Sequence, residues 1–152
     1  MDMSKCLDRF LDAQRTVYPI ALEEICRGKK DSHWMWFIFP QLRGLGRSTE
    51  SWYFGIADLQ EAKDYLAHPI LGQRLREITE AALELEETDP LKIFGWPDHM
   101  KFRSCMTLFA RVSEDDLFTK ALEKYFDGWE DRLTLELLAG EAGRETVSDT
   151  LI

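Results

Sequence analysis

The sequence lacks the residues and segments that mark several large classes of protein. Its three cysteines, Cys6, Cys26 and Cys105, are odd in number and far apart, so we predict reduced, buried thiols and no disulfide framework. The three histidines are equally scattered, and no pair has the spacing of ligands on a helix, so we predict no metal. No window approaches about 18 apolar residues, and no basic-then-apolar leader is present, so we expect neither a membrane span nor a signal peptide. The expected location is therefore the cytoplasm.

The chain also lacks a positive charge excess and the short motifs of well-known enzyme classes. A net charge of −9 and a pI near 4.8 argue against binding of bulk nucleic acid or of an anionic membrane. There is no nucleophile elbow, phosphate loop or dinucleotide fingerprint, so we predict no cofactor. What is present is a length of 152 residues with 45% hydrophobic and 31% charged residues, which is typical of one globular domain.

Apolar residues recur with helical spacing along most of the chain. This pattern, with its capping residues, predicts helices at about residues 4–15, 19–27, 58–68, 69–87, 98–112, 113–126 and 131–139. Residues 91–96 are expected to form a turn, and 33–39 and 52–56 are the segments with extended character. We therefore predict a mainly α, compact single-domain helical bundle over residues 1–139 with at most one or two short extended segments. A flexible tail is expected over residues 140–152.

The segment of residues 29–48 combines a dense run of aromatic residues with basic and polar ones. Trp34 and Trp36 stand two positions apart, so in an extended, largely buried segment their rings share one face. The rings either belong to the core or stack a planar ligand, since aromatic faces bind nucleobases with about 1–3 kcal/mol each. Arg47 follows two glycines and suits phosphate, although a solvated arginine is the alternative, as a structural histidine is for His33. The ligand-binding candidates in this segment are His33, Trp34, Trp36, Gln41, Arg47 and Ser48.

A second group of polar residues opens the predicted helix at 98–112. Asp98 is either its N-cap or a candidate catalytic carboxylate, and Lys101 lies on the same side as Asp98 and Ser104. A lysine and a serine near a helix N-terminus favour an anion site, and structural ion pairing is the alternative. Glu50 is the other candidate catalytic carboxylate, or else a plain exposed side chain. The remaining ligand-binding candidates are Tyr53, Lys101, Ser104 and Asp131, and convergence of these clusters would indicate one pocket.

Several motifs occur in an order typical of one protein family. The stretch Ser32–Gln41 is the most specific of them, and Tyr65–Pro69 and Asp98–Ser104 follow it. On these residues, over about 5–138, the chain resembles the domain of unknown function 1810 family. That family is similar, in fold and in placement of motifs, to the YbiA-like or NADAR superfamily. The superfamily motif Ser-Glu-His-Tyr-Phe is matched in part by residues 49–53, which keep its glutamate as Glu50.

The resemblance implies a compact helical domain with a nucleotide-sized pocket. Characterised relatives in the superfamily are linked to NAD and ADP-ribose and cleave N-glycosidic bonds of ribosylated substrates. The resemblance therefore implies an ADP-ribose-like or NAD-derived nucleotide as the ligand, and the leading hypothesis is an N-glycosidase. A non-catalytic nucleotide-binding module and a protein-interaction domain are the alternatives. Nothing in the sequence indicates the oligomeric state.

Overall fold

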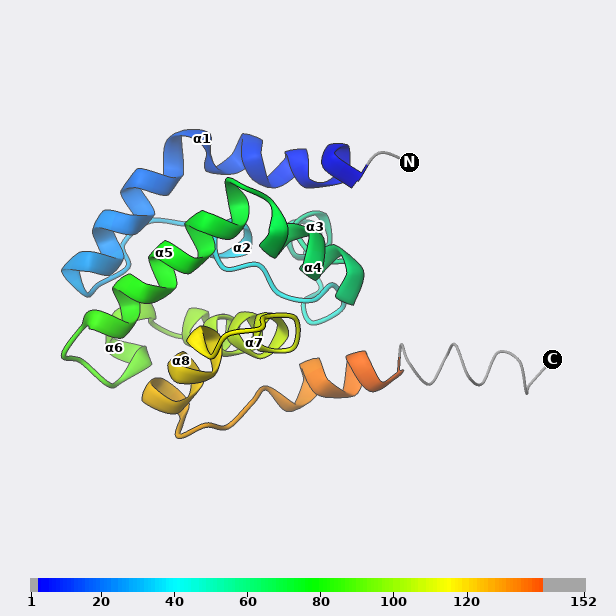
Figure 1. Ribbon diagram of the computed structural model, residues 1–152. Coiled ribbons are helices and arrows are strands. Elements are labelled where there is room, and N and C mark those ends of the chain that lie inside the picture. The colour runs from blue at the N-terminus through cyan, green and yellow to red at the C-terminus, as the bar shows by residue number, and fades with distance from the viewer. Residues whose placement is uncertain (1–2, 141–152) are drawn as a thin grey trace.

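The computed structural model describes residues 3–140, with side chains from residue 7 onward, and it is mainly α-helical as predicted (Figure 1). Within this range no β-strand forms, and the extended pairing amounts to an isolated parallel bridge between Leu42 and Ile56. The predicted tail at 140–152 lies outside the described residues, except for residue 140, which ends a last helix over 132–140. The other helices are α1 (Met3–Arg27), α2 (Met35–Ile38), α3 (Thr49–Tyr53), α4 (Leu59–Ala67), α5 (Leu71–Glu84), α6 (Pro90–Phe94), α7 (Asp98–Ala110) and α8 (Leu117–Phe126).

The N-terminal region forms one long helix, α1, where the sequence predicted two. Pro19 lies inside it and removes one backbone donor, and Figure 1 shows that the helix bends along its length. The helix continues through the proline because one face stays in the core on both sides of it. The buried residues of that face are Leu7, Phe10, Gln14, Tyr18, Ala21 and Ile25.

Both segments predicted as extended contain helical residues. Residues 35–38 form the short helix α2, so Trp34 and Trp36 do not share a face. Successive residues of a helix are turned by about 100°, so side chains two apart point in nearly opposite directions. Trp34 is 1% exposed, while Trp36 is half-buried. The segment 52–56 begins within α3, and only its end pairs, through the amide of Ile56 and the carbonyl of Gln41 at 2.9 Å.

Helix caps explain where several helices begin, and two were placed correctly. The carboxylate of Asp58 accepts a hydrogen bond from the amide of Glu61 at 2.8 Å, and Asp131 accepts one from the amide of Thr134 at 2.9 Å. Asp98 was wrongly predicted as a cap: it is the first residue of α7, and its side chain makes no capping bond. The expected turn at 91–96 is instead mostly α6, which Asp89 caps.

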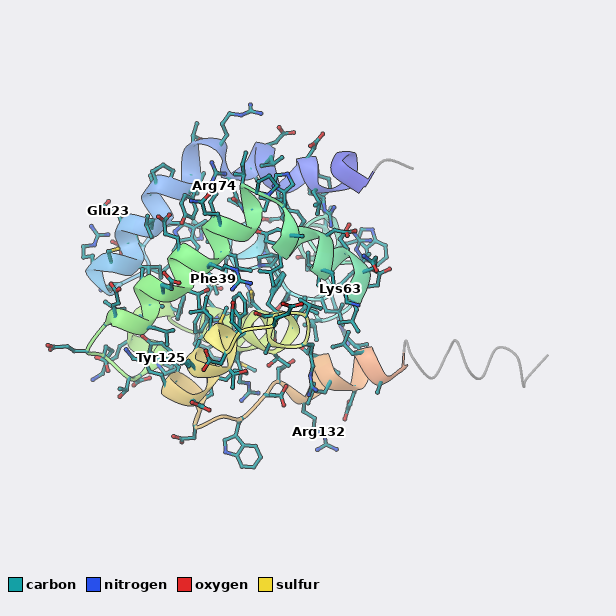
Figure 2. The ribbon with its side chains drawn as sticks, in the orientation of Figure 1. Glu23, Phe39, Lys63, Arg74, Tyr125 and Arg132 are labelled. Atoms are coloured by element: carbon teal, nitrogen blue, oxygen red, sulfur yellow. The ribbon has the colours of Figure 1, made fainter. Side chains whose placement is uncertain are left out.

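The core is rich in aromatic rings that fix α7 against its neighbours. The rings of Phe39 and Phe102 meet edge to face at 5.1 Å, and Phe94 stacks on Phe102 at 4.4 Å. Figure 2 labels Phe39 in the interior behind α5, while Arg132 points away from the body of the molecule. Of the cysteines, Cys105 is buried as predicted, but Cys26 is exposed. None of the helices in residues 3–140 is both long and apolar enough to cross a membrane.

Packing places the functional candidates at one side of this core. Helix α1 lies along α5, and α7 lies along α8, with α2 contacting both α1 and α7 (Figure 1). The turn that joins α1 to α2 therefore approaches the N-terminus of α7, which brings residues 30–36 beside residues 98–104.

Candidate functional site

A buried carboxylate on α1 holds the turn that leads into α2. Glu24 is 3% exposed, and one of its oxygens accepts hydrogen bonds from the amides of Asp31 and Ser32 at 2.7 and 2.9 Å. The same oxygen accepts the indole N–H of Trp34 at 2.9 Å, and the other accepts the hydroxyl of Ser32 at 2.6 Å. Glu24 thus fixes both the backbone of this turn and the ring of Trp34.

These bonds also set the charge of Glu24. Burial by itself raises the pKa of a carboxyl group, but the hydrogen bonds from Ser32, Asp31 and Trp34 outweigh it and lower the pKa of Glu24 to about 2. The side chain is therefore ionised at neutral pH although it is buried.

The second carboxylate of this region, Asp98, lies between two lysines. Its oxygens are 2.8 Å from Nζ of Lys30 and 3.1 Å from Nζ of Lys101. The backbone amide of Lys30 donates to the carbonyl of Ile93 at 2.7 Å, which fixes the lysine against α6. The ammonium of Lys30 also donates to the carbonyl of Ser32 at 2.6 Å, so two elements distant in sequence converge on Asp98.

The two lysines keep Asp98 ionised. Burial raises the pKa of this carboxyl group, but the hydrogen bonds and charges of Lys30 and Lys101 outweigh that effect and lower it below its ordinary value. Lys101 is the more accessible of the two, and its ammonium also lies 4.0 Å from the centre of the Trp36 ring.

A cavity of about 230 Å³ opens beside these groups, and we call it the lysine cavity. Its polar and aromatic lining comprises Lys30, His33, Trp34, Trp36, Phe37, Glu50, Asp98 and Lys101. Both candidate catalytic carboxylates therefore face this cavity, with Asp98 in the ion-pair cluster and Glu50 exposed near the start of α3. The backbone of α3 positions Glu50, because Ser48 caps that helix by accepting the amide of Ser51 at 3.0 Å.

A second cavity of about 210 Å³ adjoins the first, and we call it the glutamine cavity. The two share Trp36 and Lys101, so these side chains form the wall between them. Its other polar lining residues are Gln41, Ser104 and Asp131. Neither cavity alone reaches the roughly 300 Å³ at which small-molecule sites usually begin, but the pair does.

Comparisons with known proteins agree with this architecture. The family model described as "Protein of unknown function (DUF1810)" matches residues 4–138. The chain belongs to this DUF1810 family. A solved structure from Mycobacterium tuberculosis, the conserved hypothetical protein Rv1873, is 48% identical, with a TM-score of 0.86. That match covers 88% of this chain and 96% of the other. No curated protein matches the chain significantly.

In this DUF1810 member the structure brings together most, but not all, of the sequence-predicted site residues. Arg47 is exposed and lines neither cavity, and Ser48 serves as the cap of α3. Tyr53 lies elsewhere, in a wider hollow of about 600 Å³ that Arg43 and Trp52 also line. Gly46, which precedes Arg47, lines the glutamine cavity together with Trp36, but the arginine itself lines neither cavity.

Neither Glu24 nor Lys30 was among the site residues predicted from the sequence. Glu24 follows Ala21 by three positions and therefore lies on the buried face of α1, where an ionisable residue calls for partners. That signal was available in the sequence. The identity of the partners was not, because they belong to the turn beyond the helix. Within residues 7–140, no three His, Cys, Asp or Glu side chains cluster as a metal site requires.

Proposed function

We propose that the two cavities bind one small phosphate-bearing nucleotide of the ADP-ribose type and that the chain hydrolyses its N-glycosidic bond. The observation that carries this proposal is the convergence at the shared wall. There the ammonium of Lys101 lies 3.1 Å from Asp98 and 4.0 Å from the centre of the Trp36 ring. A cation for phosphate, a flat ring for a base and an anion for the sugar thus meet within one small region.

Binding would divide between the two cavities. Lys30 is 7% exposed and already bonded to Ser32 and Asp98, so Lys101 and His33 remain to contact phosphate oxygens in the lysine cavity. The Trp36 ring at the wall offers a stacking surface for the base. Placement of Trp34 and Trp36 in the core and in a cavity wall, rather than in a flat exposed patch, is the reason to favour a small ligand over a protein partner.

The two carboxylates of the lysine cavity suit different steps of hydrolysis. Ionised Asp98 would stabilise the positive charge that develops on the sugar as the bond from its anomeric carbon to the base nitrogen breaks. Glu50 has no side-chain hydrogen bond or ion pair among the described residues, so it is the group free to accept a proton from water. The water oxygen then bonds to the anomeric carbon, and the base leaves with the electron pair of the broken bond.

Calorimetric titration with ADP-ribose tests the binding step. Lys101→Ala should lower the affinity about tenfold or more, whereas Lys63→Ala, which removes an exposed lysine on α4, should leave it unchanged. Unmeasurable binding of ADP-ribose to the unaltered protein would overturn the proposal.

Chromatography of NAD incubated with the protein tests the chemical step. Glu50→Gln should abolish release of ADP-ribose from NAD while the affinity for ADP-ribose stays within about twofold. One observation favours binding without catalysis: both oxygens of Asp98 are already paired with lysines. Tight binding of ADP-ribose with no product from NAD would establish that alternative.

A further inference from the structure

The glutamine cavity is lined by an amide that has no hydrogen-bond partner among the described residues. Gln41 is 7% exposed and lines the cavity, and its side chain makes no hydrogen bond to any residue that the structure describes. Its backbone is fixed, because its carbonyl accepts the amide of Ile56 at 2.9 Å. The amide nitrogen and oxygen of Gln41 are not fully enclosed, so they are open to a group bound in the cavity.

A second buried glutamine, Gln14, allows a comparison within the same chain. Gln14 is 1% exposed, and its amide nitrogen donates to the carbonyl of Phe37 at 2.7 Å and to the hydroxyl of Tyr65 at 3.0 Å. Its oxygen accepts from Arg74 at 3.2 Å. The same side chain is thus fully bonded where its role is structural and unbonded where it lines a cavity.

The neighbours of Gln41 define which groups a ligand should present. The hydroxyl of Ser104 donates to the carbonyl of Met100 at 3.1 Å, which leaves its oxygen able to accept. One oxygen of Asp131 is bonded to Thr134, and the other lies 3.5 Å from the guanidinium of Arg103. The cavity therefore presents two acceptors and one amide that both donates and accepts. Its wall also holds the ammonium of Lys101, which is paired with Asp98 at 3.1 Å.

The remaining walls favour a flat, apolar body. Leu45, Pro97, Met100 and Leu133 line the cavity together with Trp36. Gly46 lets its loop lie against that ring, since a Cβ atom there would be 3.3 Å from Cη2 of Trp36 and 2.7 Å from Cβ of Ser51. A cavity of about 210 Å³ suits a single substituted ring better than a whole nucleotide.

We infer that the glutamine cavity binds an uncharged planar ring that carries a carboxamide, or a lactam with the equivalent N–H and C=O groups. Gln41 recognises these two groups through a pair of hydrogen bonds. The donor and acceptor of an amide complement those of Gln41, and extra N–H groups suit the acceptors of Ser104 and Asp131. The corresponding carboxylate is disfavoured, because it has no donor for Ser104 or Asp131 and would lie near the charge of Asp131, while the ammonium of Lys101 is already paired with Asp98. The inference rests on the proposed function in one respect: the ring would be the base of the nucleotide bound in the lysine cavity.

Benzamide and benzoate form a matched pair of probes, since they share shape and differ in the donor and the charge. Saturation-transfer NMR with the whole chain should detect benzamide binding, and benzoate should bind about tenfold more weakly or not at all. Gln41→Glu and Ser104→Ala should each weaken benzamide binding. Equal binding of the two probes, or no binding of benzamide, would overturn the inference.

A thermal unfolding experiment distinguishes a binding role of Gln41 from a structural one. Gln41→Leu should leave the melting temperature unchanged or raise it, because the amide that it removes has no protein partner, whereas Gln14→Leu should lower it by several degrees. Equal losses in the two variants would show that Gln41 is structural. Benzamide binding without ADP-ribose binding would reject the proposed function alone, and the reverse result would reject this inference alone.

Discussion

Two carboxylates, the buried Glu24 and the partly exposed Asp98, hold the turn before α2, and their partners differ in kind. Glu24 on α1 is bonded by neutral donors of Asp31, Ser32 and Trp34, and it lines neither cavity. Asp98 on α7 is bonded by two lysines and lines the lysine cavity. Both side chains are ionised, but only Asp98 has charged neighbours that a ligand can also contact. We therefore assign stability mainly to Glu24 and ligand chemistry to Asp98.

Removal of Glu24 should have the largest effect. Glu24→Ala leaves several donors in a buried region without an acceptor, and each such group costs about 1–3 kcal/mol, so we expect a loss of about 3 kcal/mol or more. Urea unfolding measures this loss. Glu23→Ala is the control, since its exposed pair with Arg27 at 3.3 Å contributes below about 0.5 kcal/mol. Similar losses in the two variants would contradict the role of Glu24 as an anchor.

The pH dependence of stability tests the assignment of a stabilising role to Glu24. The pKa of Glu24 is lowered from 4.5 to about 2 in the folded protein, so its contribution is fully present above about pH 4.5. The contribution is lost as the pH falls from there through about 2, and it amounts to something on the order of 3 kcal/mol. Glu24→Gln should therefore lose less stability than the unaltered protein between about pH 5.5 and pH 3 in urea titrations. Parallel curves would show that Glu24 does not titrate in this way.

Substitution of Asp98 should cost less stability and change ligand binding more. Asp98→Asn removes one negative charge beside Lys30 and Lys101, so stability should fall by about 1–2 kcal/mol. The affinity for inorganic pyrophosphate should rise about three- to tenfold, while release of ADP-ribose from NAD should fall. Asp115→Asn is a matched control, because Asp115 also has a lowered pKa and an arginine partner, Arg76, but lies away from both cavities. Unchanged pyrophosphate affinity in Asp98→Asn would remove Asp98 from the site.

The same comparison shows what the sequence could and could not predict. The contact of Asp98 with Lys101 follows from their spacing of three residues on a helix, and the caps at Asp58 and Asp131 follow from local patterns. The contact of Asp98 with Lys30 joins residues far apart in the chain, and no local rule gives it. Pro19 was misread for a related reason, since contacts of the whole helix with the core keep α1 continuous across the proline.

The aromatic segment at residues 33–39 shows most clearly where prediction from local sequence fails. A run of aromatic and aliphatic residues indicates a strand, because such residues prefer strands locally. In the structure Glu24 instead fixes the turn before this run, and the short helix α2 begins directly after that turn. Once the segment is helical, Trp34 turns into the core and Trp36 toward the cavities. The candidates on this segment, His33, Trp34 and Trp36, all line the lysine cavity. The loop after it could not be placed by its glycines alone, because a loop position does not fix the direction of a long side chain.

Substitution of Arg47 should have the smallest effect on ligand affinity, and it tests whether the side chain of this loop residue reaches the cavities. It follows Gly46, which lines the glutamine cavity, yet Arg47 itself is exposed and lines neither cavity. Arg47→Ala should therefore change the affinity for ADP-ribose by less than about twofold in calorimetry, compared with tenfold or more for Lys101→Ala. A loss as large as that of Lys101→Ala would mean that the loop closes over the ligand and brings its guanidinium to the phosphate, and the sequence-based prediction for Arg47 would then be right.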